Sequence, residues 1–168
     1  MNILTVLWIP GCATEAVEGC PSAGSVGRIE ADITAQDTPG LCDSWCEVII
    51  EGRLTLEQAV DEADVVCIAG VEGDLLIGGV ELVEPLVLPR LRYVDGNVLL
   101  GTSGSVTTTD GLPQLTWVSG YFEIIHSGIE DISGLDALES VGSLSLYWNE
   151  HLTGISGLSA LSEITTQL

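Results

Sequence analysis

With 168 residues, 46% of them hydrophobic but only 5% aromatic, the chain is long enough for one domain with a sizeable, largely aliphatic core. Twenty-five acidic residues against four arginines and no lysine give a formal net charge of −21 at pH 7, which argues against binding to nucleic acids or anionic lipid surfaces because it repels their phosphates. The same charge permits Ca²⁺ or a basic partner without requiring either, so we predict no cofactor.

The first twelve residues resemble the end of a bacterial lipoprotein signal. A short apolar run at residues 3–9 is followed by Pro10-Gly11-Cys12, and in such signals the cysteine after a small residue becomes lipidated. No basic segment precedes the run, so the alternative that Cys12 is an ordinary, unlipidated cysteine stays open. Residues 13–41 are predicted to form an acidic, cysteine-containing tether. We therefore expect an extracytoplasmic protein, secreted or facing the cell surface or periplasm, with no membrane contact beyond this lipid.

All five cysteines lie within the first 67 residues, ahead of the repeats described below. A metal cage would need closely spaced cysteine pairs with histidines nearby. The closest pair here is Cys42 and Cys46, and the two histidines, His126 and His151, lie far downstream. Disulfides in an exported protein fit this pattern better, and no metal site is predicted.

A repeat of about two dozen residues is the decisive feature of the sequence. Each unit is an L-x-x-L-x-x-[V/I] block, and every block but the last leads into a glycine-led stretch with apolar residues two apart. The leading leucines, spaced by 24, 23 and 23 residues, are Leu88, Leu112, Leu135 and Leu158. Strands are predicted at residues 73–77, 96–100, 120–124 and 142–146. Because so short a strand cannot bury its apolar face alone, successive strands must stack into a parallel ladder.

One more unit precedes these blocks. Residues 46–56 match residues 67–77 class by class, 21 positions apart. Between them, residues 55–63 begin with a T-x-x-Q capping box and carry good helix formers. We predict an amphipathic helix there that covers the open first end of the stack.

The order of these features resembles the receptor L domain, the ligand-binding module of insulin-type and epidermal-growth-factor-type receptors that also occurs in bacterial surface proteins. The shared pattern is a helix, a cysteine, [V/I]-E-G-x-L-x-[I/L], L-P-x-L-x-x-V and successive glycine-led strands, and it is clearest over residues 67–100. The resemblance implies an α/β repeat fold, a right-handed parallel β-solenoid with an N-terminal capping helix, over residues 42–168. The cysteine-rich modules and kinase of those receptors are missing, so receptor signalling is not implied.

The same resemblance implies a disulfide pattern. In that family a cysteine ahead of the capping helix pairs with the cysteine before the next strand. Carried over to this chain, the rule gives a Cys46–Cys67 bridge. It leaves Cys20 to pair with Cys42, and Cys12 free for lipid.

The chain departs from the family pattern at its C-terminal end, where residues 164–168 should begin a further strand. An uncovered parallel strand edge favours aggregation. Either the chain is a fragment, or its last turn is covered by a partner or by a second copy.

Amphipathic aromatic residues gather on and after the last two predicted strands. We predict that they form a non-catalytic recognition site for a protein or glycan on the strand face. The candidate ligand-binding residues are Tyr121, Glu123, His126, Tyr147 and Trp148. The alternative is that Trp117 and Trp148 fill edges of the core and the histidines are incidental turn residues. Asn149, in an L-x-L-x-x-N motif, is assigned a purely structural role in its turn.

No catalytic constellation is convincing, and we predict no enzyme. Ser127, His126 and Asp131 are close in sequence, but adjacent residues of a strand and turn point apart. A glycan-cleaving β-solenoid enzyme would need basic groups on a strand face, whereas Arg90 and Arg92 lie in an L-x-x-L block. The main alternative function is a structural envelope or spacer protein that assembles through its C-terminal end.

Overall fold

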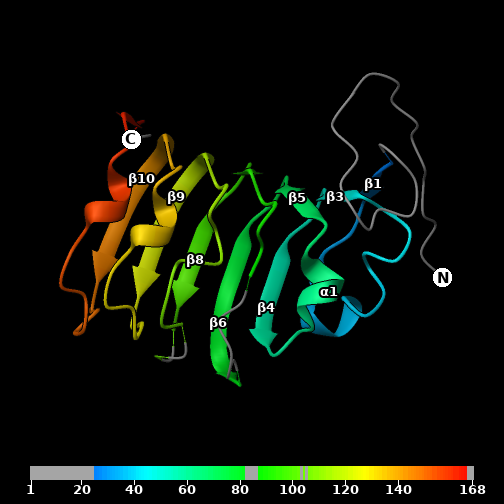
Figure 1. The fold of residues 1–168 in the computed structure, drawn as a ribbon, viewed down its shortest axis with the longest axis horizontal. Helices are drawn as coiled ribbons and strands as arrows, with labels where there is room; N and C mark the ends of the chain where they lie inside the picture. Colours follow the sequence, from blue (N-terminus) through cyan, green and yellow to red (C-terminus); the bar gives the residue numbers. More distant parts are fainter. Residues whose placement is uncertain (1–24, 82–86, 103, 105, 166–168) are drawn as a thin grey trace.

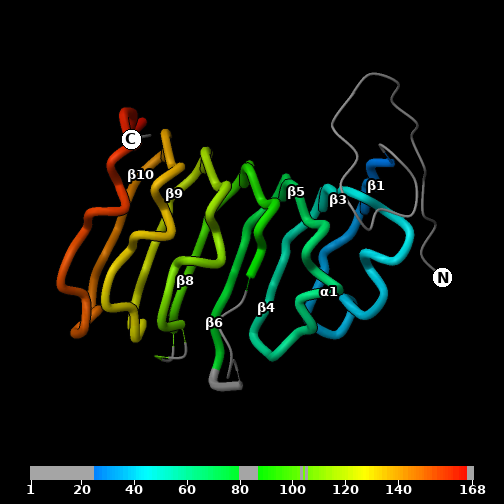
Figure 2. Tube along the Cα trace, viewed as in Figure 1, coloured from blue at the N-terminus to red at the C-terminus, as the bar shows by residue number. Residues whose placement is uncertain are grey.

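The computed structural model describes residues 25–81, 87–102, 104 and 106–165, and over these residues the chain winds into a parallel β-solenoid of about six turns (Figure 1). Successive coils follow one another along the long axis of the molecule (Figure 2). Within this part of the chain no helix is both long enough and apolar enough to cross a membrane.

Each coil contributes to one or both of two parallel ladders. The first ladder contains β1 (Val26–Ile29), β3 (Glu47–Ile50), β5 (Ile68–Val71), β7 (Tyr93–Val94), the beginnings of β9 (Trp117–Ile125) and β10 (Ser140–Tyr147), and β11 (Glu163–Ile164). The second ladder contains β2 (Ile33–Thr34), β4 (Leu54–Gln58), β6 (Leu75–Glu81), β8 (Val98–Gly101) and the ends of β9 and β10. The third side of the coils is made of turns and of the short helices η1 (Ala35–Asp37), α1 (Glu62–Val65), η2 (Ser133–Leu135) and η3 (Ser156–Leu158).

The register of the two ladders confirms the stacking predicted from the repeat. In the second ladder Leu54 pairs with Leu75, and Leu75 pairs with Val98. In the first ladder Ile50 pairs with Val71, which is the 21-residue correspondence between the upstream unit and the next one. Because side chains alternate between the two faces of a strand, this register places the apolar positions of every coil on the inner side.

The core is a column of stacked aliphatic side chains. The apolar positions of the first three L-x-x-L-x-x-V blocks are all buried: Leu88, Leu91, Val94, Leu112, Leu115, Val118, Leu135, Leu138 and Val141. In the last block Leu158 and Leu161 are only partly buried, because no further described coil stacks on them. Each coil is a single layer of this column, so its apolar side chains are buried mainly by the coils on either side of it.

Glycines form the corner at which the chain passes from the first ladder to the second. A Cβ atom at Gly73 would lie 2.6 Å from the carbonyl oxygen of Gly52, and one at Gly96 would lie 2.4 Å from that of Gly73. Neighbouring coils approach too closely here for any side chain. This close approach is the physical reason for the glycine at this corner in the coils that follow the first one, in which Ala31 takes its place.

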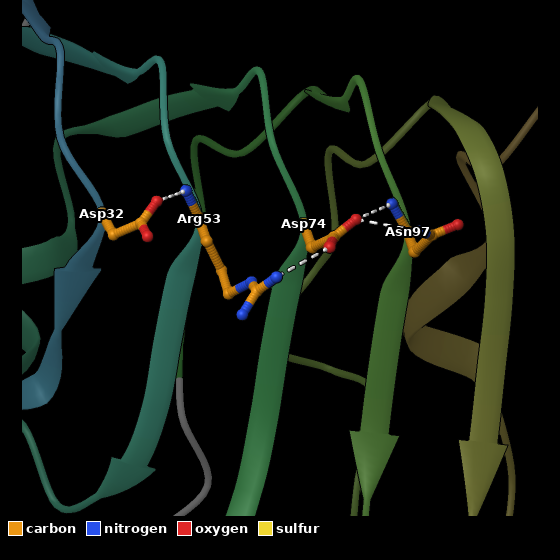
Figure 3. A network of polar contacts seen from close by, with 4 residues as sticks. All are labelled: Asp32, Arg53, Asp74 and Asn97. Carbon is orange, nitrogen blue, oxygen red and sulfur yellow. Dashed lines mark hydrogen bonds and ion pairs between the residues drawn. The ribbon is translucent and has the colours of Figure 1, made fainter.

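A row of polar residues follows the glycine corner (Figure 3). The Asp32 carboxylate accepts a hydrogen bond from the Arg53 backbone N–H at 2.7 Å, and Asp74 accepts from the backbone and side-chain nitrogens of Asn97, both at 2.9 Å. The Asn97 side-chain oxygen accepts from the backbone N–H of Tyr121 at 3.1 Å. The Arg53 guanidinium lies 3.5 Å from Asp74. Three of these side chains therefore bond to the backbone of the following coil and hold the coils in register.

The capping helix predicted over residues 55–63 is wrong. Residues 54–58 form β4, with Leu54 and Leu56 fully buried against β6, so the two-residue apolar alternation prevails over helix propensity. Among the described residues the one α-helical segment is α1, a single turn in which the Asp61 carboxylate accepts a hydrogen bond from the Ala63 backbone N–H. Since α1 connects β4 to β5, it forms the third side of one coil and does not cover the end of the solenoid.

The solenoid begins earlier than the predicted boundary at residue 42. β1 pairs with β3 and β2 with β4, so residues from Val26 onward, assigned above to the tether, already form a coil. The signal-like residues 1–12, with Cys12, and the first part of the tether, with Cys20, lie outside the described residues.

The disulfide pattern taken from the receptor L domain is also wrong. Cys67 is bonded to Cys42, with their Cα atoms 5.5 Å apart, and not to Cys46. The predicted Cys20–Cys42 pair is thereby ruled out, while Cys46 is itself disulfide-bonded. The register gives the reason. Val48 pairs with Ile68, so Cys67 lies opposite Glu47 and not opposite Cys46. The turn before β3 brings the Cys42 sulfur next to the Cys67 backbone N–H.

Candidate functional site

Three of the predicted binding residues meet where β9 and β10 end. Ile125 pairs with Tyr147, so the turn residues that follow them, His126 and Trp148, lie on adjacent coils at the same height. The rings of His126 and Trp148 have centroids 4.6 Å apart at an interplanar angle of 30°. Tyr147 packs edge-on against Trp148 with centroids 5.0 Å apart. We refer to His126, Tyr147 and Trp148 as the aromatic cluster.

The backbone of this turn is unusual. Thr102, His126 and Trp148 occupy equivalent places on three successive coils and have φ values of 82°, 47° and 56°. Residues other than glycine adopt positive φ rarely, and asparagine or glycine is the common choice. All three residues are exposed, so the left-handed turn displays their side chains to solvent.

Asn149 fixes the turn that carries the aromatic cluster. Its side-chain oxygen accepts hydrogen bonds from the Ser127 backbone N–H at 3.1 Å and from the Ser127 hydroxyl at 2.7 Å. Its side-chain nitrogen donates to the carbonyl oxygen of Ile124 at 2.8 Å. One amide thus joins two adjacent coils at the residue that follows Trp148, which is the structural role that the L-x-L-x-x-N motif indicated.

Glu123 extends the aromatic cluster onto the strand face. It accepts a hydrogen bond from the Tyr147 hydroxyl, and this bond raises the pKa of Tyr147 above its ordinary value. Tyr121, by contrast, is not part of the group. It lies four residues before Ile125 on β9, at the glycine corner, which is roughly 13 Å away along an extended strand.

A hollow of about 550 Å³ opens beside the aromatic cluster. Three successive coils contribute to it. Its lining includes Thr102, His126, Ser127, Trp148, Glu150 and His151. Within it Ser127 is buried and bonded to Asn149, so the other five side chains give the hollow its chemical character.

The two exposed tryptophans differ in their surroundings. Trp148 is 64% exposed, so the alternative that it fills an edge of the core is wrong. Trp117 is 39% exposed, lies on the first ladder and packs against Tyr93 with ring centroids 6.4 Å apart. Trp148 suits contact with a ligand, because the fold holds its large apolar ring exposed to solvent.

The positive charges of the protein lie away from this site. Arg28 pairs with Glu51 and Glu72, and Arg92 makes two bonds of 2.8 Å to the Glu47 carboxylate, all on or next to the first ladder. Arg53 belongs to the corner row, and Arg90 donates to the carbonyl oxygen of Cys46 at 2.6 Å. The sequence has no arginine or lysine after Arg92, and none lines the hollow.

The polar groups near the aromatic cluster have structural partners. The Ser127 hydroxyl donates to Asn149, and Asp131 accepts from the backbone and the hydroxyl of Ser133, at 2.9 and 2.5 Å. These bonds hold the pKa of Asp131 below its ordinary value. Ser127, His126 and Asp131 therefore do not form a hydrogen-bonded relay, and no group of three potential metal ligands occurs among the described residues.

Comparison with models of protein families, with curated proteins and with solved structures gives no match.

The sequence predicted the aromatic members of the site but missed Thr102 and Glu150. Both residues reach the hollow only because coils 22 to 24 residues apart stack in register. A sign was present in the spacing, since Thr102, His126 and Trp148 recur at nearly the same interval as the leucine blocks. Their common left-handed backbone is not visible from residue type.

Proposed function

We propose that this protein is a non-catalytic recognition module of the extracytoplasmic surface, which binds a protein or glycan at the aromatic cluster and the adjoining hollow. Its solenoid form and glycine-led coils support a relationship to receptor L domains. The Cys42–Cys67 disulfide supports an oxidising compartment, since disulfides persist mainly in exported proteins. A lipid anchor at Cys12 would hold the module at a bacterial cell surface.

One observation carries this proposal: Trp148 is 64% exposed, although Tyr147, His126 and the Asn149 turn hold it in a fixed place. A large apolar ring held in water is costly unless a ligand covers it. The hollow beside it provides a concave surface with hydroxyl, imidazole and carboxylate groups, which suits non-covalent recognition of a polar ligand.

Ligand capture by paired variants tests the proposal. We expect the wild-type protein to bind members of a combined glycan and peptide array, and Trp148→Ala to lose at least about tenfold in affinity for them, as is usual for a central aromatic contact. Trp117→Ala is the matched control, because it removes an exposed tryptophan from the first ladder, and it should bind as the wild type does. Tyr121→Ala should also bind normally. Equal binding by the Trp148 and wild-type proteins would place recognition elsewhere.

A second candidate function, self-assembly into an envelope or spacer structure, is favoured by the last described coil. Ile155 is 59% exposed while the equivalent Ile132 is fully buried, and Ile164 is 52% exposed while its ladder partner Val141 is fully buried. A second copy stacked on this coil would cover both isoleucines. Sedimentation velocity should then show oligomers that Ile155→Glu dissociates, and a strict monomer at all concentrations would exclude this function.

A further inference from the structure

We propose that the hollow beside Trp148 takes a cationic side chain, an arginine or lysine presented by a protein partner. This inference rests on the proposed recognition function and specifies the ligand of the same site. It combines three observations: the exposed aromatic rings, the carboxylates next to them, and the absence of arginine and lysine from the lining of the hollow.

The aromatic rings provide the first part of such a site. A guanidinium or ammonium group is attracted to the face of tryptophan or tyrosine within about 6 Å of the ring centroid. Tyr147 meets Trp148 edge-on, with centroids 5.0 Å apart, so the two rings present faces in different directions. His126 packs against Trp148 with centroids 4.6 Å apart and a tilt of 30°, and Trp148 nevertheless keeps most of its surface in solvent.

Two carboxylates provide the second part. Glu150 lines the hollow, and Glu123 is bonded to the Tyr147 hydroxyl of the aromatic cluster. Carboxylates at the rim of an aromatic surface attract a cation and give it direct hydrogen-bond partners.

The charge distribution provides the third part. Arg28 and Arg92 pair with glutamates on or next to the first ladder, and Arg53 lies near Asp74 at the glycine corner. Arg90 donates to the carbonyl oxygen of Cys46. Residues 93–168 contain acidic residues but no arginine or lysine. The potential at the hollow is therefore negative, which attracts cations and repels anionic ligands such as acidic glycans. Charge complementarity thus selects a basic protein segment.

Nuclear magnetic resonance titration of the full chain with two short peptides tests the inference. The probes are Ac-Gly-Arg-Gly-NH₂ and the same peptide with citrulline, which has nearly the shape of arginine but no charge. We expect the arginine peptide to shift the Trp148 indole N–H signal and the Glu150 amide signal saturably. The citrulline peptide should bind at least about tenfold more weakly, because the charged hydrogen bonds and the cation–π contact are lost.

Variants locate the binding site in the same experiment. Glu150→Gln should lower the affinity for the arginine peptide by about threefold or more, since it removes the negative charge of the side chain without changing its shape. Glu163→Gln, an exposed glutamate on β11, is the matched control and should leave the affinity unchanged. Trp148→Leu should abolish the shifts. Equal affinity for the two peptides, or shifts confined to residues outside the hollow, would overturn the inference.

A third probe separates this inference from the proposed function. If a neutral oligosaccharide such as chitotetraose binds in a Trp148-dependent way and the arginine peptide does not, recognition stands and the cationic ligand is wrong. If neither the peptides nor any member of the array binds at the hollow, both proposals are wrong. Binding of the arginine peptide that weakens as NaCl rises from 50 to 500 mM supports both.

Discussion

At the scale of single residues, a few polar side chains hold the coils of this solenoid together. Asn149 is the clearest case, because its amide makes three hydrogen bonds to Ile124 and Ser127 on the preceding coil. The sequence indicated this role through the L-x-L-x-x-N spacing. It did not indicate that the same turn would carry an exposed tryptophan at positive φ, since that depends on backbone geometry.

Replacement of Asn149 tests this role. Asn149→Ala should lower the free energy of unfolding by about 2 kcal/mol, because it leaves the Ser127 N–H and the Ile124 carbonyl without their partner. Urea denaturation measures this value. The neighbouring exposed variant Glu150→Gln is the control and should change it by less than about 0.5 kcal/mol. A loss of similar size in both variants would contradict the structural role of Asn149.

The Glu47–Arg92 pair predicts a pH dependence. The hydrogen bonds from Arg92 hold the pKa of Glu47 below its ordinary value, so Glu47 stabilises the folded state above its unfolded pKa of about 4.3. That stabilisation is lost as the pH falls through the lower folded pKa. Glu47→Gln should therefore reduce the Tm at pH 7, and the Tm values of the variant and the wild type should converge below about pH 4. A constant difference across this range would show that the pair does not act through charge.

At the scale of elements, sequence reasoning succeeded for the strands and failed for the helix. β6 and β8 start two residues after their predicted positions, and the strands predicted at residues 120–124 and 142–146 lie within β9 and β10. These predictions succeeded because a glycine indicates close approach of two coils and the alternating apolar residues indicate a buried face. Residues 55–63 met the local rules for a helix. The burial of Leu54 and Leu56 against the next coil outweighed this local helix propensity. Such a contact between coils cannot be read from a short stretch of sequence.

The glycine corner gives a prediction at this scale. Gly96→Ala should destabilise the protein by roughly 1–3 kcal/mol, because its Cβ would meet the Gly73 carbonyl oxygen at 2.4 Å. Gly154→Ala is the matched control, since nothing lies within 4 Å of a Cβ there. Because alanine lowers the conformational entropy of the unfolded chain, that variant should be as stable as the wild type or more stable by up to about 1 kcal/mol. Equal thermal midpoints for the two variants would mean that the corner does not constrain the coils.

At the scale of the whole molecule, the site exists only because the coils stack. Thr102, Ser127 and Glu150 come from three different coils and are separated by more than twenty residues each, yet they line one hollow. The sequence predicted the stack from its period and the aromatic members from their residue types. The hollow, the Cys42–Cys67 disulfide and the earlier start of the solenoid follow from register between coils. A repeat of two dozen residues leaves that register uncertain by a position or two.

Scalar couplings across backbone hydrogen bonds test the parallel stack most directly. The structure predicts a coupling from the amide nitrogen of Leu54 to the carbonyl carbon of Asp74, and from that of Leu75 to the carbonyl carbon of Asn97. In a parallel ladder the N–H of a residue donates to the neighbour of the residue it pairs with, so two paired residues do not exchange hydrogen bonds. Reciprocal couplings between Leu54 and Leu75, the signature of an antiparallel pair, would contradict the solenoid and remove the hollow with it.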